Sequence, residues 1–143
     1  MRYVRDGYVI DTDGERLESP TIHAYLSRSY WAEHRSLAVV EKSLKHSLNF
    51  GLYDQSQVKP HQVGLARVIT DYATFAYLCD VYILETHQGK GLGKWLMETV
   101  TSHPELSSLR RFMLITRDAH GLYRQYGFKD LASPERWMEI YRA

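Results

Sequence analysis

Cysteine and proline are scarce in this chain of 143 residues, and it contains no long uninterrupted apolar run. Because Cys79 is the only cysteine, no disulfide can form within the chain, which fits a reducing compartment. No segment approaches the ~20 consecutive apolar residues that a membrane-spanning helix needs. Residues 1–15 carry charges throughout and lack the apolar stretch of a signal peptide. We therefore expect a cytoplasmic protein without a membrane partner.

An excess of charge of one sign is also lacking. The chain has 18 Lys and Arg against 17 Asp and Glu, a formal net charge of +1. Since a duplex-binding protein normally carries a clear basic excess, we expect no nucleic-acid partner. Hydrophobic residues make up 44% and charged residues 24%, which is ordinary for a globular protein. The length is that of one domain, so we expect a single domain over residues 1–143.

The histidines show no pattern of metal ligands. There are seven of them, and none is paired with another His, Cys or carboxylate at the spacing of helical metal motifs. Two lie in segments of interest, because His87 precedes a glycine-rich turn and His120 begins a predicted helix. The sequence predicts no metal site.

Apolar periodicity predicts an α+β protein. The turn at residues 70–73 joins its flanking strands as an antiparallel hairpin. The order of elements predicts a mixed central sheet of about six or seven strands flanked by about four helices. The predicted strands cover residues 3–11, 47–53, 61–69, 77–84, 111–116 and 136–142. One predicted helix begins at Pro20, and the others cover residues 36–46, 94–102 and 118–126, the last with Asp118 as its N-cap and Gly127 as its closing residue.

The other elements are arranged around residues 75–97. An almost unbroken apolar run from Tyr77 to Leu84 predicts a strand buried on both faces, and Asp80 is the one charge in it. A glycine-rich turn follows, and then a helix. The first turn of a helix leaves backbone N–H groups without partners, and glycines let a phosphate approach them closely. The stretch therefore predicts an anion site at residues 88–93.

Two common phosphate-binding motifs do not fit the spacing of this turn. A P-loop requires Gly-Lys followed by Ser or Thr, whereas Gly93-Lys94 is followed by Trp95. The dinucleotide fingerprint, begun at Gly89 and Gly91, has Lys94 where its third glycine belongs. Both motifs are excluded.

The turn instead resembles the acyl-CoA signature of the GCN5-related N-acetyltransferase (GNAT) family, Gln/Arg-x-x-Gly-x-Gly/Ala, which here is residues 88–93. Residues 116–128 are similar to a second segment of that family, Ala-x-x-Leu-Tyr-x-x-x-Gly-Phe. The resemblance implies the acyl-CoA N-acyltransferase (GNAT) fold and acetyl-CoA as co-substrate. The implied contacts with CoA come from Val81, Ile83, Gln88, Gly89, Lys90, Gly91, Leu92, Gly93 and Lys94.

The resemblance also assigns chemistry. It makes Tyr123 the general acid that protonates the leaving CoA thiolate; otherwise Tyr123 is a buried aromatic that anchors its helix. Alternation puts Tyr77, Cys79 and Val81 on one face and Asp80 on the other. In some relatives a glutamate occupies the position of Cys79. Asp80 is therefore the candidate catalytic carboxylate, acting directly, through a water or on a substrate ammonium, and its alternative role is an ion pair with an arginine such as Arg67.

The expected function is transfer of an acetyl group from acetyl-CoA to a primary amine of a small molecule or protein. Trp31, Arg35 and Tyr77 are the candidate acceptor-site residues, the first two because this fold places its acceptor-site helices there. The alternative is a CoA-binding regulatory module that has lost catalysis, since a glutamate on the strand is missing. A homodimer is left open, because exposed strand edges often pair in this fold.

Overall fold

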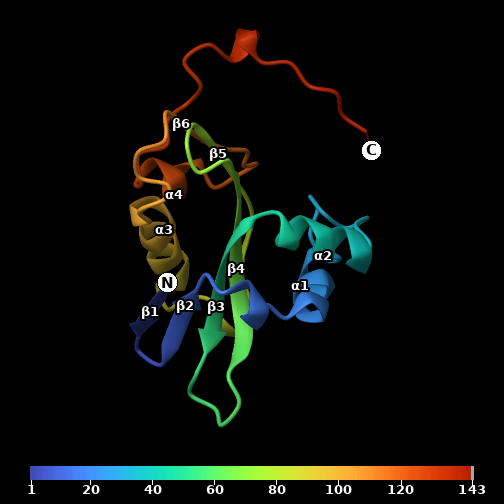
Figure 1. Ribbon diagram of the computed structural model, residues 1–143, viewed down its shortest axis with the longest axis vertical. Coiled ribbons are helices and arrows are strands. Elements are labelled where there is room, and N and C mark those ends of the chain that lie inside the picture. Colours follow the sequence, from blue (N-terminus) through green and yellow to red (C-terminus); the bar gives the residue numbers. More distant parts are fainter. Residues whose placement is uncertain (143) are drawn as a thin grey trace.

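The strands of the central sheet follow one another in space in the order in which they occur in the chain (Figure 1). The computed structural model describes residues 1–142. Strands β1 to β5 pair antiparallel and β6 pairs with β5 in parallel, so the predicted α+β class with a mixed sheet is confirmed. The strands are β1 (Arg2–Arg5), β2 (Tyr8–Asp11), β3 (Leu48–Asp54), β4 (His61–Thr70), β5 (Phe75–Ile83) and β6 (Arg111–Leu114).

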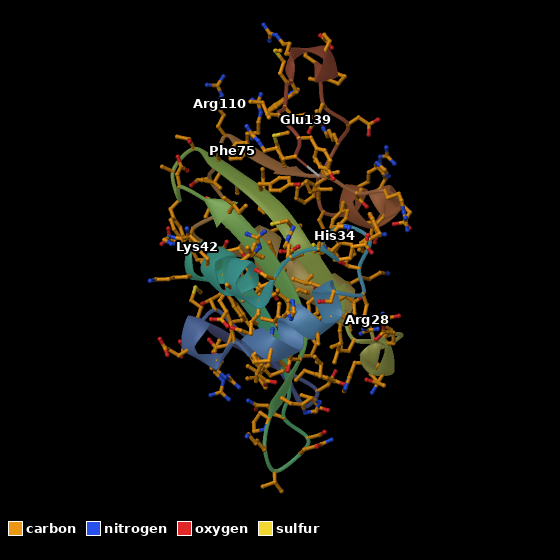
Figure 2. The ribbon with its side chains drawn as sticks, turned by 90° about the vertical axis from the view of Figure 1, so that its right-hand side faces the viewer. Arg28, His34, Lys42, Phe75, Arg110 and Glu139 are labelled. Atoms are coloured by element: carbon orange, nitrogen blue, oxygen red, sulfur yellow. The ribbon has the colours of Figure 1, made fainter. Side chains whose placement is uncertain are left out.

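Helices cover both faces of the sheet (Figure 1). One face packs against α3 in the larger apolar core, and the other packs against α1 and α2 in a second core. Figure 2 looks onto the second face, where Lys42 lies on α2 and Arg28 and His34 lie after α1. The helices are α1 (Ser19–Leu26), α2 (Leu37–Lys45), α3 (Leu92–Ser102) and α4 (His120–Arg124), with short 3-10 turns η1 (Gly14–Arg16), η2 (Glu85–His87) and η3 (Pro134–Arg136).

Local signals explain where the longer helices begin and which side they bury. Pro20 lies in the first turn of α1, and the Ser36 side chain accepts a hydrogen bond from the N–H of Val39 to cap α2. In α3 the apolar residues spaced four apart all lie in the larger core. None of the helices in residues 1–142 is long and apolar enough to cross a membrane.

Residues 3–11 form the hairpin of β1 and β2, so the prediction of one strand was wrong. Asp6 and Gly7 have φ angles of 50° and 82°. Two consecutive residues with positive φ are typical of the two-residue turns that join antiparallel strands, and Asp-Gly is a favoured pair there. Alternation continued on both sides of the turn and so resembled a single strand.

The fourth helix is shorter than predicted and begins differently. It covers His120–Arg124, and Ala119 occupies the N-cap position that was predicted for Asp118. The hydroxyl of Thr116 accepts a hydrogen bond from the N–H of Ala119 at 3.0 Å. Ala119 has no side-chain acceptor, so its side chain cannot cap the N–H groups of the first turn. Gly127, with φ 94°, closes the turn after the helix as predicted.

The predicted last strand is wrong for the single chain. Residues 136–142 belong to no strand, and after η3 they are exposed. The backbone of Trp137 is extended, with φ −94° and ψ 137°. The segment therefore continues extended beyond η3 at Trp137, and it has no neighbouring strand within residues 1–142.

A bulge in β5 changes which side chains share a face. The register with β4 shifts at this point, and Asp80 has a φ of 50°. As a result Val81 packs against the same core as Leu78, although alternation puts them on opposite faces. The prediction that Val81 shares a face with Tyr77 and Cys79 was therefore wrong.

Candidate functional site

The glycine turn forms an open surface at the start of α3. Gly89 and Gly91 have φ angles of 80° and 76°, and Gly91 occupies the N-cap position of the helix. A Cβ atom added at either position, or at Gly93, would meet no atom within 4 Å. Residues 88–91 are exposed, and the first N–H groups of α3 have no acceptor within the helix. An anion can therefore approach these amides from solvent.

Two lysines add positive charge at this turn. The ammonium nitrogen of Lys90 lies 3.4 Å from the hydroxyl oxygen of Tyr8, which comes from β2. Lys94 is exposed in the first turn of α3, and its carbonyl accepts a hydrogen bond from the Tyr126 hydroxyl at 3.2 Å. This bond ties the chain after α4 to the beginning of α3.

A gap opens between β5 and β6 beside the turn. The two strands pair only over Phe75–Leu78, and no later residue of β5 pairs with β6 in the described chain. The N–H of Leu84 donates to β4, so the backbone groups of Ile83 and Val81 point away from β4, toward the gap. The carbonyl of Ile83 accepts a hydrogen bond from the Gln88 side chain at 2.9 Å. Gln88 thus joins the turn to the edge of the gap.

Tyr123 lies on α4 and lines a hollow beside β6. Its ring packs edge-on against Phe128, with ring centroids 5.9 Å apart. Within residues 1–142 its hydroxyl donates no hydrogen bond, so the backbone partner expected of a merely anchoring tyrosine is not found. Burial, with a smaller contribution from Tyr30, raises the pKa of Tyr123. The hydroxyl is therefore protonated at neutral pH and free to donate.

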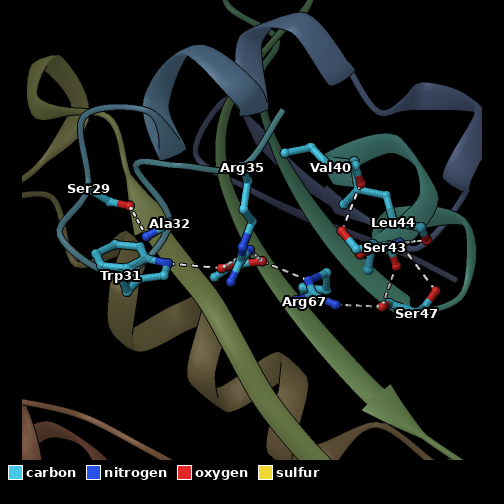
Figure 3. A network of polar contacts seen from close by, with 11 residues as sticks. Ser29, Trp31, Ala32, Arg35, Val40, Ser43, Leu44, Ser47 and Arg67 are labelled. Carbon is cyan, nitrogen blue, oxygen red and sulfur yellow. Dashed lines mark hydrogen bonds and ion pairs between the residues drawn. The ribbon is translucent and has the colours of Figure 1, made fainter. Parts of the chain in front are cut away.

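The buried carboxylate of Asp80 is fully engaged by side chains from distant parts of the chain. Arg67 of β4 donates from Nε to Oδ2 at 2.7 Å, and Arg35 donates from Nη1 to both oxygens at 2.8 and 3.0 Å. The indole of Trp31 donates to Oδ1 at 2.9 Å. Figure 3 shows these three donors converging from opposite sides. The alternative role predicted for Asp80, an ion pair with Arg67, is thus present.

Electrostatics make Asp80 a weak base. Its burial opposes ionisation, but the guanidinium groups of Arg67 and Arg35 outweigh that effect and hold the pKa of Asp80 below its ordinary value. Burial raises the pKa of the Cys79 thiol to about 11. It also raises the pKa of Tyr77. A thiol with so high a pKa is not a ready nucleophile, so an acyl-cysteine intermediate is disfavoured.

The connector between α1 and α2 brings an aromatic cluster to the same place. Trp31 packs edge-on against Tyr30 at 5.2 Å between ring centroids, and the guanidinium of Arg117 lies 3.8 Å over the Tyr30 ring. Arg117 precedes α4, so this contact joins the connector between α1 and α2 to the segment before the helix of Tyr123. Sequence reasoning missed Tyr30 and Arg117, because nothing in their local pattern reveals a contact across the fold.

Three side chains of metal-ligand type also meet, which the sequence spacing did not predict. Asp54, His61 and His87 offer ligand atoms that all lie within 4.8 Å of one another. Two of them are also hydrogen-bonded to other residues: Asp54 accepts hydrogen bonds from Ser56, and Nδ1 of His87 lies 2.8 Å from the Tyr8 hydroxyl oxygen. We interpret these contacts as holding the loop before the glycine turn against β2 and β3.

Comparison with known sequences identifies similar proteins. The sequence model described as the acetyltransferase (GNAT) domain matches residues 50–130, which is more than half of the chain. A protein from Gibberella zeae, provisionally named an acetyltransferase, is 35% identical over 148 residues, which cover 91% of this chain and 84% of that protein.

Solved structures agree. A crystal structure from Xanthomonas campestris pv. campestris, provisionally named an acetyltransferase of the GNAT family, is 45% identical with a TM-score of 0.90, and covers 97% of this chain and 96% of its own. A protein from Clostridium acetobutylicum solved with acetyl-CoA has a TM-score of 0.63 over 94% of both chains, at 14% identity. The latter likeness shows the fold alone.

Proposed function

This chain belongs to the GCN5-related N-acetyltransferase (GNAT) family, and on that premise we propose that it transfers an acetyl group from acetyl-CoA to a primary amine of a small molecule or protein. The observation that carries the proposal is the position of the open glycine turn beside the gap between β5 and β6. Tyr123 follows β6 on α4, and within residues 1–142 its hydroxyl donates no hydrogen bond. The acetyl-CoA-bound structure from Clostridium acetobutylicum supports the choice of donor.

The proposed binding of CoA uses backbone groups and two lysines. The diphosphate contacts the N–H groups of residues 88–93, where glycines leave room and the helix dipole adds positive charge. Lys90 and Lys94 add charge at the rim. The pantetheine arm extends along β5 and bonds the outward-facing backbone of Val81 and Ile83, so that the thioester reaches the gap.

In the proposed reaction the neutral amine nitrogen attacks the thioester carbonyl carbon directly. A C–N bond forms, the C–S bond breaks, and its electron pair leaves with the sulfur. Tyr123 gives its proton to that sulfur and is protonated again from solvent, while the acetylated nitrogen loses one proton to solvent by way of Tyr77. Because burial keeps the pKa of Tyr123 raised, the proton is available at the pH at which the amine is partly neutral.

We assign Asp80 a positioning role in the acceptor site. Its carboxylate holds the indole of Trp31 and the guanidinium of Arg35 at the acceptor side of the gap. A direct general-base role stays a prediction, and the lowered pKa of Asp80 weakens it. Trp31, Arg35 and Tyr77 are the proposed lining of the acceptor pocket.

The test is a panel of primary amines assayed with acetyl-CoA, with release of free thiol as the readout, alongside calorimetry with CoA. We expect a heat of CoA binding and turnover on at least one amine. Absence of any CoA heat would contradict the proposal at its first step.

The rival function is a CoA-binding regulatory module. The observation that favours it is that Arg67 and Arg35 both bind the carboxylate of Asp80, so that β5 offers no free carboxylate as a general base. Normal CoA affinity without thiol release from any amine would support this module. We place either protein in the cytoplasm, in keeping with its single cysteine, with CoA and an acceptor amine as its small-molecule partners and a second copy of the chain as its candidate protein partner.

A further inference from the structure

β6 is an edge strand of the sheet and is less covered than β2 to β5. Most core-facing residues of β2 to β5 are buried, whereas Phe112, Met113 and Leu114 are all only half-buried, and Ile115 after them is 79% exposed. A hollow of about 680 Å³ lies along the strand, bounded by α4 and residues 126–134. No strand in residues 1–142 pairs with the outer edge of β6. Stable proteins normally pair or cover such an edge.

The same chain contains a strand-like segment without a neighbour. This segment, residues 136–142, is called the arm here. Met138 and Ile140 are 96% and 80% exposed, and Trp137 and Tyr141 are exposed as well. Figure 1 shows the arm leaving the body above the sheet and ending far from β6. So much exposed apolar surface on one segment marks an interaction site.

The hinge before the arm directs it away from its own β6. In η3, Arg136 and Trp137 donate backbone hydrogen bonds to Ser133 and Pro134 at 3.0 and 3.1 Å. The guanidinium of Arg111, the first residue of β6, lies 5.0 Å over the Trp137 ring. These contacts fix the direction in which the arm leaves, and the ring of Pro134 restricts the turn that would bring it back.

We propose that two copies of the chain exchange arms, so that residues 136–142 of each copy pair with the free outer edge of β6 in the other. Each chain has a strand-like arm with no neighbouring strand and a β6 edge with no strand paired to it. A two-fold exchange of arms between two copies pairs both. The arm of the other copy then becomes the seventh strand of each six-stranded sheet. The inference does not depend on acetyl transfer, because it concerns only mass and strand pairing.

The first experiment compares two single substitutions in the full chain. Sedimentation or light scattering should give the wild-type protein twice the 16.7 kDa chain mass. Ile140→Glu should weaken dimerisation by roughly 30-fold or more, as expected for a central apolar contact. Val58→Glu is the matched control, because Val58 is fully exposed in the β3–β4 turn and should leave the mass unchanged. A monomeric wild-type protein would overturn the proposal, as would Ile140→Glu with unchanged dimerisation.

The second experiment asks which chain the arm contacts. A photoreactive phenylalanine analogue replaces Tyr141 in an isotope-labelled chain, which is mixed with unlabelled wild-type chain and irradiated. We expect peptides that join residue 141 to residues 111–116 of the other isotope, and none from the same analogue placed at Val58. Cross-links confined to one chain would show that the arm folds back onto its own β6 and would reject the exchange.

Discussion

Tyr123 and Tyr126 lie within one turn of each other, yet their hydroxyl groups are held differently. Tyr126 donates to the carbonyl of Lys94 and so fastens α4 to α3. Tyr123 lines the hollow beside β6, and in the described residues its hydroxyl donates to no other group. A phenolic hydroxyl that is already bonded is a poor proton donor to a new partner, so Tyr123 is the better general acid.

Tyr123→Phe should lower kcat by roughly 100-fold or more, because the thiolate then leaves without a proton donor. CoA affinity measured by calorimetry should be unchanged, since the hydroxyl is proposed to act on the sulfur alone. Tyr126→Phe is the matched control and should retain far more activity. A Tyr123→Phe protein with full kcat would remove the general-acid assignment.

The pH dependence of the wild-type enzyme should follow the amine rather than Tyr123. Burial holds the pKa of Tyr123 above its ordinary value near 10. Its hydroxyl therefore keeps its proton as pH rises, while a growing fraction of the amine becomes neutral and reactive. We expect kcat/KM to increase with pH and to show no loss of the general acid below about pH 10. A descending limb in the wild-type profile that is absent from Tyr123→Phe would contradict this.

Asp80→Asn should destabilise the fold by about 3 kcal/mol, or roughly 10 °C in Tm, because it leaves the buried charge of Arg67 without a carboxylate. Thermal denaturation measures the change. Asp130→Asn is the control: its ion pair with Arg124 is exposed and should contribute at most about 1 kcal/mol. Equal effects of the two substitutions would argue against a structural ion pair at Asp80.

The same pair predicts sensitivity to acid. The folded-state pKa of Asp80 is depressed, so its stabilisation is present at neutral pH and is lost as pH falls below about 4 through the folded pKa. Asp80→Asn should therefore lose less stability than the wild-type protein over that range. Parallel acid-unfolding curves for the two proteins would show that other carboxylates account for the wild-type loss.

At the scale of the element, the glycine turn offers a substitution that separates folding from ligand binding. Gly89 and Gly91 need positive φ, so alanine there strains the backbone by roughly 1–2 kcal/mol. Gly93 needs no positive φ, and a methyl group added there meets no protein atom. The space beside it is where the diphosphate is proposed to lie.

Gly93→Ala should therefore keep or raise Tm, since alanine is the better helix former, while it weakens CoA binding by roughly tenfold or more. Calorimetry and thermal denaturation on the same sample measure both quantities. Gly14→Ala, at another open glycine in η1, should leave CoA affinity unchanged. Unchanged affinity in Gly93→Ala would mean that the diphosphate does not approach α3 at this residue.

Local patterns predicted the elements but not the irregularities between them. The spacing of apolar residues identified α2, β3 and β4 because each buries one continuous face. The alternation of β5 failed as a predictor at Asp80, because the bulge there adds one residue to the strand. The side chains that follow therefore point to the opposite face from the one predicted. The partners of Asp80 were beyond local reasoning, because Trp31 and Arg35 are 49 and 45 residues away in the chain. The ion pair with Arg67 was foreseeable because the two residues share one hairpin.

At the scale of the whole molecule, the two cores differ in how well they are closed. The core under α1 and α2 is covered by the connector between these two helices, and the ion pairs of Asp80 hold that connector against the sheet. The larger core is sealed along β2 to β5 and open along β6, where the apolar side chains are half-buried. The alternating pattern of residues 136–142 thus predicted a strand that the single chain does not form. A local sequence pattern cannot show which strand this segment pairs with, and we propose that its partner is β6 of a second copy.

Hydrogen exchange should make this difference visible in solution. A backbone N–H that pairs with a neighbouring strand exchanges only when the pair opens, so an exchanged arm slows exchange both in β6 and in the arm. We expect residues 111–114 and 136–142 to be protected in the wild-type protein and to lose protection together in Ile140→Glu. Residues 61–70 of β4 should stay protected in both proteins, because β4 lies between β3 and β5 whether or not the arm is docked. Protection of β6 that survives in Ile140→Glu would mean that something other than the arm covers that edge.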